Sequence, residues 1–189
     1  MSKDEIKLKA FPFIEGEDVF LCPIQSEHAE LYTKWANHPK GRRYSRFVVP
    51  ITIENARQWA QSTDDIPKNI GFEIWYKKDN KPIGTCGIGD IDWINRTAFL
   101  FMNIGEPEYW NKHLGTQAGK LLLKYAFNEL NLNRLVAKIY EPNIGSWKVA
   151  EKIGFTFEGI QKAAVYVDGK YYGAKAYGLL KEDWLKKGS

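Results

Sequence analysis

The chain has 189 residues, of which 44% are apolar and 14% aromatic, a composition that supports one packed domain and excludes a disordered protein. Its net charge of +4 comes from 27 basic and 23 acidic residues without a long basic block, which argues against direct nucleic-acid binding. The first residues, MSKDEIKLKAFPF, lack the apolar core of a signal peptide, and no apolar run approaches the roughly 18 residues that span a membrane. We expect a cytoplasmic protein that does not contact a membrane.

The first part of the chain predicts an arm followed by a strand. Residues 1–16 are charged and irregular, and we interpret them as an N-terminal arm before one domain over residues 17–187. Val19–Ile24 is an apolar run typical of a strand. It contains Cys22, which together with Cys86 lacks metal-ligand spacing; both are interpreted as buried thiols, and no metal site is expected.

Two helices follow, separated by a basic loop. Residues 26–38 carry apolar side chains on one helical face, and Pro39 ends this helix. Residues 41–50 are basic and aromatic and are interpreted as a loop. Residues 52–63 again show the helical spacing of apolar side chains.

The middle of the chain predicts three antiparallel strands. They are Phe72–Tyr76, Ile83–Ile91 and Thr97–Ile104. The third is largely apolar, which is typical of a central strand. A polar loop leads from it to a helix.

The second half alternates helices and strands. Thr116–Leu130 forms one apolar stripe of helical period, Leu135–Tyr140 is a strand, and Asn143–Ile153 is a short helix that Gly154 ends. Two alternating runs around Asp168-Gly169 predict a hairpin. The whole pattern predicts an α/β fold with a mixed, twisted sheet of six or seven strands and about four flanking helices.

Two segments could carry chemistry. In EYWNKHLGTQAGK, a glycine-containing loop runs into a helix, whose free backbone N–H groups bind phosphates in many proteins; an ordinary helix start explains it equally well. In EPNIGSWKVAEKIGF, a strand delivers Asn143 to a helix start, where a cap is the simpler interpretation. Ser146 follows one turn later, and its hydroxyl either bonds its own helix or faces a cleft.

Together these segments resemble a known family. YWNKHLGTQAGKLLLKYAFNELNLNRL resembles the acetyl-CoA loop and helix of the GNAT superfamily in its RimJ/RimL-type branch. NIGSWKVAEKIGFTFEG is similar to the motif that comes next in that branch, and VDGKYYGAKAYGLLKEDW to its closing hairpin. The resemblance covers about Val19 to Trp184.

The resemblance implies a GNAT fold that transfers acetyl from acetyl-CoA to a primary amine. The CoA pyrophosphate is then expected on backbone N–H groups, and the pantetheine arm beside the strand that ends near residue 105, where an N–H polarises the thioester carbonyl. Homodimers are common in the family. The implied coenzyme contacts are Asn103, Ile104, Gly105, Asn111, Lys112, His113, Leu114, Gly115, Thr116, Asn143 and Lys148.

Some positions depart from the family pattern. His113 stands where the loop normally has its first glycine, and we interpret it as a phosphate neighbour or solvent-facing substitute rather than a base. Ala150 occupies the position of a tyrosine that protonates the leaving thiolate in many relatives, which makes Ser146 the expected general acid.

The expected site is short of carboxylates. Phe99, the run Ala163–Val165 and Gly173 stand where relatives place acids. The remaining candidates, each interpreted as a surface or turn residue, are Glu73, Asp90, Asp92 and Glu106. A site without a strong base favours a protein or peptide N-terminal α-amine, because its pKa of about 8 is lower than the value of about 10.4 for lysine.

Other interpretations stay open. One is acetylation of a small molecule, namely an aminoglycoside, a polyamine or an amino acid; another is a non-catalytic acyl-CoA-binding regulatory protein. Several aromatic and basic side chains could line the acceptor side, although a solvated loop and core packing explain them slightly better: Arg42, Arg43, Tyr44, Trp59 and Trp75.

Overall fold

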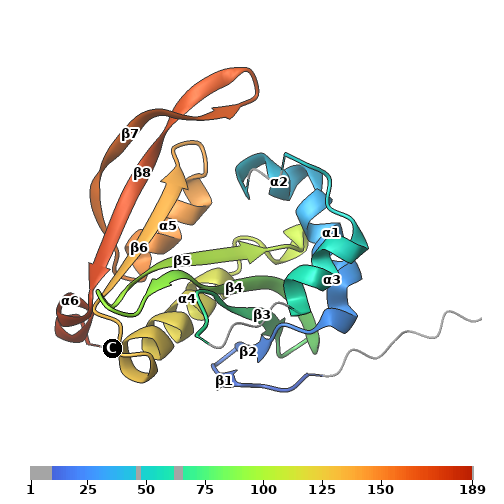
Figure 1. Ribbon diagram of the computed structural model, residues 1–189, viewed down its shortest axis with the longest axis horizontal. Helices are drawn as coiled ribbons and strands as arrows, with labels where there is room; N and C mark the ends of the chain where they lie inside the picture. The colour runs from blue at the N-terminus through green and yellow to red at the C-terminus, as the bar shows by residue number, and fades with distance from the viewer. Residues whose placement is uncertain (1–9, 46–47, 62–65, 189) are drawn as a thin grey trace, which may run out of the picture.

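One mixed sheet organises the chain (Figure 1). The structure, a computed structural model, describes residues 10–45, 48–61 and 66–188. Its strands are β1 (Ile14–Glu15), β2 (Val19–Pro23), β3 (Ile70–Tyr76), β4 (Lys81–Asp92), β5 (Thr97–Ile104), β6 (Arg134–Tyr140), β7 (Thr156–Val167) and β8 (Lys170–Leu180). Its helices are α1 (Ala29–Asn37), α2 (Pro39–Ser45), α3 (Ile53–Gln61), α4 (Leu114–Lys124), α5 (Ile144–Lys152) and α6 (Lys181–Lys186), with 3₁₀ turns η1 (Ser26–His28) and η2 (Pro107–Tyr109) and a π-helical turn η3 (Tyr125–Glu129).

The predicted α/β class is confirmed, although the predicted numbers of strands and helices were slightly too low. The described ranges hold eight strands and six α-helices. The additional strand is β1, which lies in the segment we interpreted as an arm and pairs with β2. Residues 1–9 of that segment lie outside the described residues, and the division into arm and domain stays a prediction.

The prediction of a basic loop over residues 41–50 was wrong in part, because Pro39–Ser45 forms helix α2. Pro39 ends α1 as expected, and it also begins the next helix, since a helix's first residue needs no N–H donor. Residues 46–47 lie outside the described part, as do residues 62–63 at the end of the second predicted helix. No helix of the described ranges is long and apolar enough to cross a membrane.

The strand order is β1-β2-β3-β4-β5-β6-β8-β7, with all neighbouring pairs antiparallel except β5 and β6. This parallel pair is short: only Thr97–Phe99 pairs with Arg134–Val136. Beyond it the strands diverge, as Figure 1 shows, with β5 running toward α1 and β6 rising beside the β7–β8 hairpin. Residues 100–104 and 137–140 therefore face each other across a gap in the sheet.

The main core lies between the sheet and the α4–η3 helix. Leu122 and Phe127 are fully buried there against alternate residues of the strands, including Ile74 and Ile88. Cys86 belongs to this core, while Cys22 packs in a smaller cluster with Phe20 and Trp75 on the other face. Both thiols are free and buried, which confirms the interpretation from the sequence.

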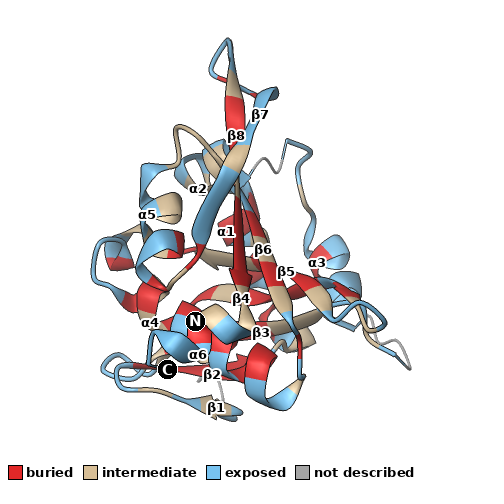
Figure 2. Ribbon diagram, turned by 90° about the vertical axis from the view of Figure 1, so that its left-hand side faces the viewer, coloured by how far each residue is buried: buried red, intermediate tan, exposed pale blue. Residues whose placement is uncertain are grey.

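The β7–β8 hairpin extends beyond this core, and most of β7 is exposed (Figure 2). Its turn confirms the prediction from Asp168-Gly169, because both residues have positive φ, of 48° and 82°. Two-residue hairpin turns require this left-handed backbone, which aspartate and glycine tolerate best.

Candidate active site

The turn before α4 presents backbone N–H groups to solvent. Asn111 and His113 both have a φ of 60°, and His113 stands at the N-cap position of α4 without a side-chain cap. The first amides of the helix therefore have no partner within the helix, and the helix dipole adds positive potential. Such a turn can hold an anion.

Positive side chains surround this turn. The Nζ of Lys152, on α5, lies 3.3 Å from Nδ1 of His113, and the Nζ of Lys112 lies 4.9 Å from the centre of the Tyr109 ring. His113 and Lys112 are exposed, whereas Thr116 is buried. The left-handed backbone fits the glycine that the family resemblance implies at position 113, because a side chain there is tolerated at a cost.

At the end of β5, the backbone N–H of Gly105 faces β4, whereas the backbone of Ile104 faces away from it. The N–H groups of Gly105 and Glu106 both donate to the carbonyl of Ile83 on β4, at 2.9 and 3.2 Å. Because backbone groups alternate along a strand, those of Ile104 point away from β4, into the gap between β5 and β6. The indole N–H of Trp110 donates to the Ile104 carbonyl at 2.8 Å. Asn103, Ile104 and Gly105 are the coenzyme contacts predicted on this strand. Of these three, Ile104 is the one whose backbone faces the gap.

The start of α5 brings Asn143 and Ser146 together. Asn143 is the N-cap, and its side-chain oxygen accepts from the Ser146 N–H at 3.4 Å, which confirms the capping interpretation. The Ser146 hydroxyl is half-buried and has no hydrogen-bond partner in the described ranges. Ala150 is buried in the core, where a tyrosine would not fit without repacking. Lys148 is exposed.

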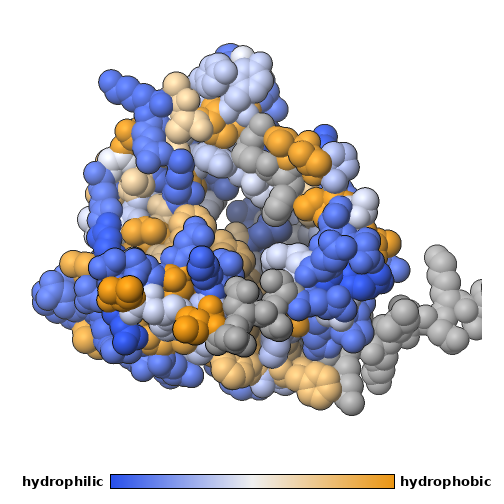
Figure 3. All heavy atoms as spheres, viewed as in Figure 1, coloured by the Kyte–Doolittle hydropathy of each residue, from blue (hydrophilic) through white to orange (hydrophobic). Residues whose placement is uncertain are grey.

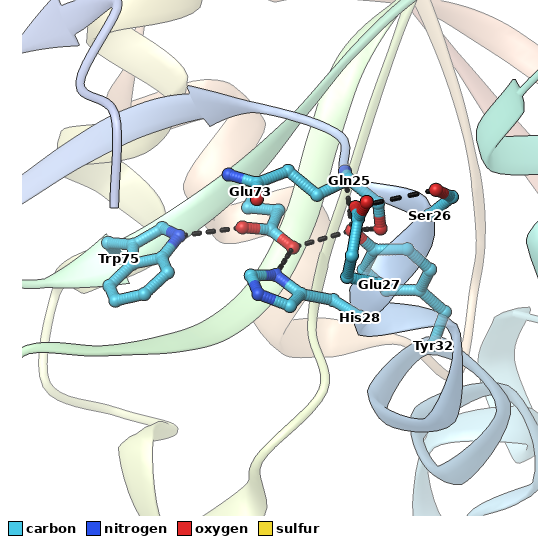
Figure 4. A network of polar contacts seen from close by, with 7 residues as sticks. All are labelled: Gln25, Ser26, Glu27, His28, Tyr32, Glu73 and Trp75. Carbon is cyan, nitrogen blue, oxygen red and sulfur yellow. Dashed lines mark hydrogen bonds and ion pairs between the residues drawn. The ribbon is translucent and has the colours of Figure 1, made fainter. Parts of the chain in front are cut away.

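Glu73 was wrongly interpreted as a surface residue, because it is fully buried. Its neighbours in β3, Phe72 and Ile74, face the α4 core, so alternation turns Glu73 to the opposite face and toward α1. There its carboxylate accepts from Tyr32 Oη at 2.5 Å and Trp75 Nε1 at 2.7 Å, and contacts His28 Nδ1 at 2.6 Å (Figure 4). Burial and this carboxylate raise the pKa of Tyr32.

Glu106 was also wrongly placed at the surface, since it is 7% exposed. Its Oε1 accepts from the Lys34 ammonium at 2.6 Å and from the Trp35 indole at 2.9 Å. Burial acts to raise the pKa of Glu106, but the bonds from Lys34 and Trp35 outweigh burial and lower it. The sequence could not reveal either carboxylate's burial, because each depends on α1 packing against a distant strand.

The other two acids lie in the last residues of β4, at the surface and beside a turn, as expected. Asp90 is exposed at a φ of 48°, and Asp92 accepts from the backbone of Asn95 and Ile94 in the turn before β5. The backbone bond from Asn95 lowers the pKa of Asp92.

A further carboxylate, Glu141, was missed by the sequence analysis. It follows β6 directly, and its Oε2 accepts from the Gly173 N–H. A Cβ at Gly173 would lie 2.6 Å from this oxygen and 2.6 Å from Ile160 Cγ2. The Glu141 carboxylate thus occupies the space that a side chain at position 173 would need. Its position between a strand and Pro142 was the available sequence signal.

The aromatic and basic candidates for the acceptor side are dispersed. Trp75 is fully buried, which confirms the core interpretation, and the Trp59 ring meets Tyr32 edge-on at 5.4 Å. Arg43, on α2, pairs with Asp168 at the tip of the β7–β8 hairpin. Figure 3 shows a hollow in the surface between the hairpin side and the helical side of the molecule.

Known proteins are similar to this chain in sequence and in fold. The family model for the acetyltransferase (GNAT) domain matches residues 18–156. The chain is 34% identical over 168 residues to "Putative ribosomal N-acetyltransferase YdaF" of Bacillus subtilis (strain 168), covering 87% of this chain and 86% of that protein. It is 27% identical over 171 residues to "Uncharacterized N-acetyltransferase p20" of Bacillus licheniformis, covering 89% and 96%.

Solved structures agree on the fold. A spermidine N-acetyltransferase from Vibrio cholerae, in complex with CoA and spermine, superposes with a TM-score of 0.81 at 19% identity, covering 90% of this chain and 99% of that one. A GNAT-family acetyltransferase from Bacillus anthracis gives 0.76 at 22% identity, covering 89% and 98%. The chain therefore belongs to the GNAT acetyltransferase family, whose members use acetyl-CoA, and it is an N-acetyltransferase.

Proposed function

We propose that this enzyme acetylates the α-amine of a protein or peptide N-terminus, in the manner of the RimJ/RimL-type branch. The proposal rests on the two buried carboxylates beside α1, both of which already accept hydrogen bonds from the same chain. Glu73 and Glu106 each contact donor groups of the same chain, so neither is left free to bind a polycationic acceptor. An α-amine needs less help than a lysine, because presenting it neutral at pH 7 costs roughly 3.3 kcal/mol less.

The coenzyme would lie along the α4 turn and the gap between β5 and β6. The amides of residues 111–116 would hold the diphosphate, with Lys148 reaching a phosphate. The arm would pass through the gap, where Ile104 offers its backbone and Asn143 its amide group. The CoA complex of the Vibrio cholerae neighbour supports a coenzyme site in this fold.

The reaction would then be a direct transfer. The neutral amine nitrogen attacks the thioester carbonyl carbon, the C–N bond forms, and the Ile104 N–H, which points away from β4, stabilises the oxyanion. The C–S bond breaks next, and the amine's surplus proton passes to water. The Ser146 hydroxyl would donate a proton to the leaving thiolate and regain one from solvent.

A small-molecule acceptor is the second candidate. The spermidine N(1)-acetyltransferase of Escherichia coli (strain K12) is 30% identical over 107 residues, covering 57% of each chain. YdaF, whose name describes a ribosomal N-acetyltransferase, matches a larger share of this chain at higher identity, and so favours a protein acceptor over a small molecule.

Thiol release from acetyl-CoA tests the proposal across peptides with free N-termini, polyamines, amino acids and aminoglycosides. We expect the peptides to give the highest kcat/KM, with a pH profile that is half-maximal near the pKa of the α-amine, about 8, and levels off above it. Faster acetylation of spermidine than of every peptide would support the second candidate. Tight acetyl-CoA binding without turnover would instead indicate a non-catalytic acyl-CoA-binding protein.

The same assay tests the general acid. Ser146→Ala should lower kcat by about 10²-fold, the lower range for loss of general acid–base catalysis, with little change in the KM for acetyl-CoA. The matched control is Ser45→Ala, on exposed α2, which removes a hydroxyl that donates to the Gly41 carbonyl. A wild-type rate in Ser146→Ala would remove Ser146 from the mechanism.

A further inference from the structure

Trp35, on α1, packs directly against the backbone of Gly105. A Cβ built on Gly105 would lie within 2.6 Å of Trp35 Cγ, Cδ1 and Cδ2. Side-chain atoms do not approach that closely, so the indole ring occupies the place where any other residue would have a side chain. Trp35 is only 3% exposed, so its ring is held in this position.

A carboxylate fixes the same ring by its polar edge. The Trp35 Nε1–H donates to Glu106 Oε1 at 2.9 Å, and the Lys34 ammonium donates to that oxygen at 2.6 Å. Glu106 is the next residue after Gly105, and the N–H groups of both bond Ile83 of β4. One carboxylate therefore joins α1 to the backbone just after β5, where the regular pairing of β5 with β4 ends.

The contact joins α1 to the residue that follows β5. Gly105 comes directly after the strand that is expected to hold the coenzyme's thioester, and Figure 1 shows α1 beside the end of that strand. Other contacts of α1 with the sheet, such as Tyr32 with Glu73, lie farther from this strand end, on β3. Trp35 is the α1 side chain that packs on the Gly105 backbone itself.

We propose that Trp35 and Glu106 are positioning residues for acetyl transfer, which fix the backbone at Gly105, beside the proposed thioester site, against α1. The inference rests on the proposed placement of the thioester at this strand end. Neither side chain takes part in a chemical step. Their effect is alignment, and a misplacement of about 1 Å can cost about 10²-fold in rate.

Two variants on one helix test the proposal. Trp35→Phe removes the N–H that reaches Glu106 and shortens the ring against Gly105. Tyr32→Phe is the matched control, because it also removes one buried donor from an α1 aromatic, in this case the donor to Glu73. We expect Trp35→Phe to lower kcat at least tenfold with the KM for acetyl-CoA changed less than threefold. Tyr32→Phe should keep kcat within threefold, even if it lowers the thermal midpoint as much.

Glu106 supplies the rescue experiment. Glu106→Gln keeps an amide oxygen that can accept from the Trp35 indole, so kcat should stay within about threefold of wild type. Glu106→Ala removes the acceptor and should reproduce the loss seen in Trp35→Phe. Thermal melts of all four variants confirm that each is folded at the assay temperature.

Equal losses of kcat in Trp35→Phe and Tyr32→Phe would overturn the proposal, because general loosening of α1 would explain both. Wild-type kcat in Glu106→Ala would overturn it as well. Either result leaves the wild-type enzyme's acetylation of peptides intact. Failure of the proposed function is a different outcome, in which wild type itself does not prefer peptide α-amines.

Discussion

The guanidinium of Arg43 lies 2.6 Å from the carboxylate of Asp168, which joins α2 to the tip of the β7–β8 hairpin. The two residues are far apart in the sequence, and Figure 1 shows α2 and the hairpin as separate parts of the molecule. Their side chains are 52% and 59% exposed. The ion pair therefore connects these two parts while staying exposed to solvent.

Because exposed ion pairs contribute only about 0–1 kcal/mol, Asp168→Asn should barely alter stability. We expect the thermal midpoint to fall by no more than about 4 °C, with a smaller difference at high salt. Thermal melts at low and high ionic strength measure this, with Arg43→Gln as the partner control. A loss above about 2 kcal/mol in urea titrations would show that the pair is more strongly coupled than its exposure indicates.

Gly105→Ala should be among the most damaging small substitutions, because the added methyl group would overlap the Trp35 ring. Overpacking in a core costs about 1–3 kcal/mol, and urea unfolding should show a loss of that size. The double variant Gly105→Ala with Trp35→Leu frees space beside residue 105. It should therefore be less destabilised than the sum of the two single variants, and simple additivity would contradict the contact.

The lowered pKa of Glu106 predicts part of the stability that the protein loses in acid. Its pKa is lower in the folded protein than the ordinary value of 4.5, so folding is favoured when the carboxylate is ionised. This stability is fully present above about pH 5 and is lost as the pH falls through the lowered pKa. Urea titrations between pH 7 and pH 3 should show a smaller acid loss in Glu106→Gln than in wild type. Parallel pH curves would contradict the assignment.

Both cysteines should resist thiol reagents in the native state. Burial raises the pKa of Cys22 to about 11 and raises that of Cys86, and neither is exposed to solvent. Since the thiolate is the reactive form, labelling with a chromogenic disulfide should be negligible at pH 8 and should reach two thiols per chain in urea. Rapid native labelling of one thiol would show that its strand opens locally.

His113→Gly should relieve backbone strain in the α4 turn. The native φ of 60° is left-handed, a conformation that costs a non-glycine residue about 1 kcal/mol, so the variant should be as stable as wild type or more stable. Acetyl-CoA titration then shows whether the imidazole, which contacts Lys152, contributes to binding. An affinity that drops more than tenfold would make His113 a coenzyme contact rather than a tolerated substitute.

Much of the fold followed from local rules. Asp168-Gly169 defines its hairpin because few residues adopt positive φ, and Asn143 caps α5 because its side chain reaches an amide three residues on. The helical spacing in α4 marks the face that meets the sheet. Helix α2 was missed because its exposed basic sequence buries no residue and so shows no apolar stripe.

The sequence by itself determined the order of most strands and helices, the turn before α4 and the family, since each depends on residues close together in the chain. Only the tertiary structure decided which acids are buried, where β5 and β6 separate and which side chain lies on Gly105. Glu73 and Glu106 look like ordinary surface acids until α1 supplies their donors. Contacts between residues about 40 to 70 positions apart leave no periodic signal, because burial is a property of the packed elements and not of the spacing within one of them.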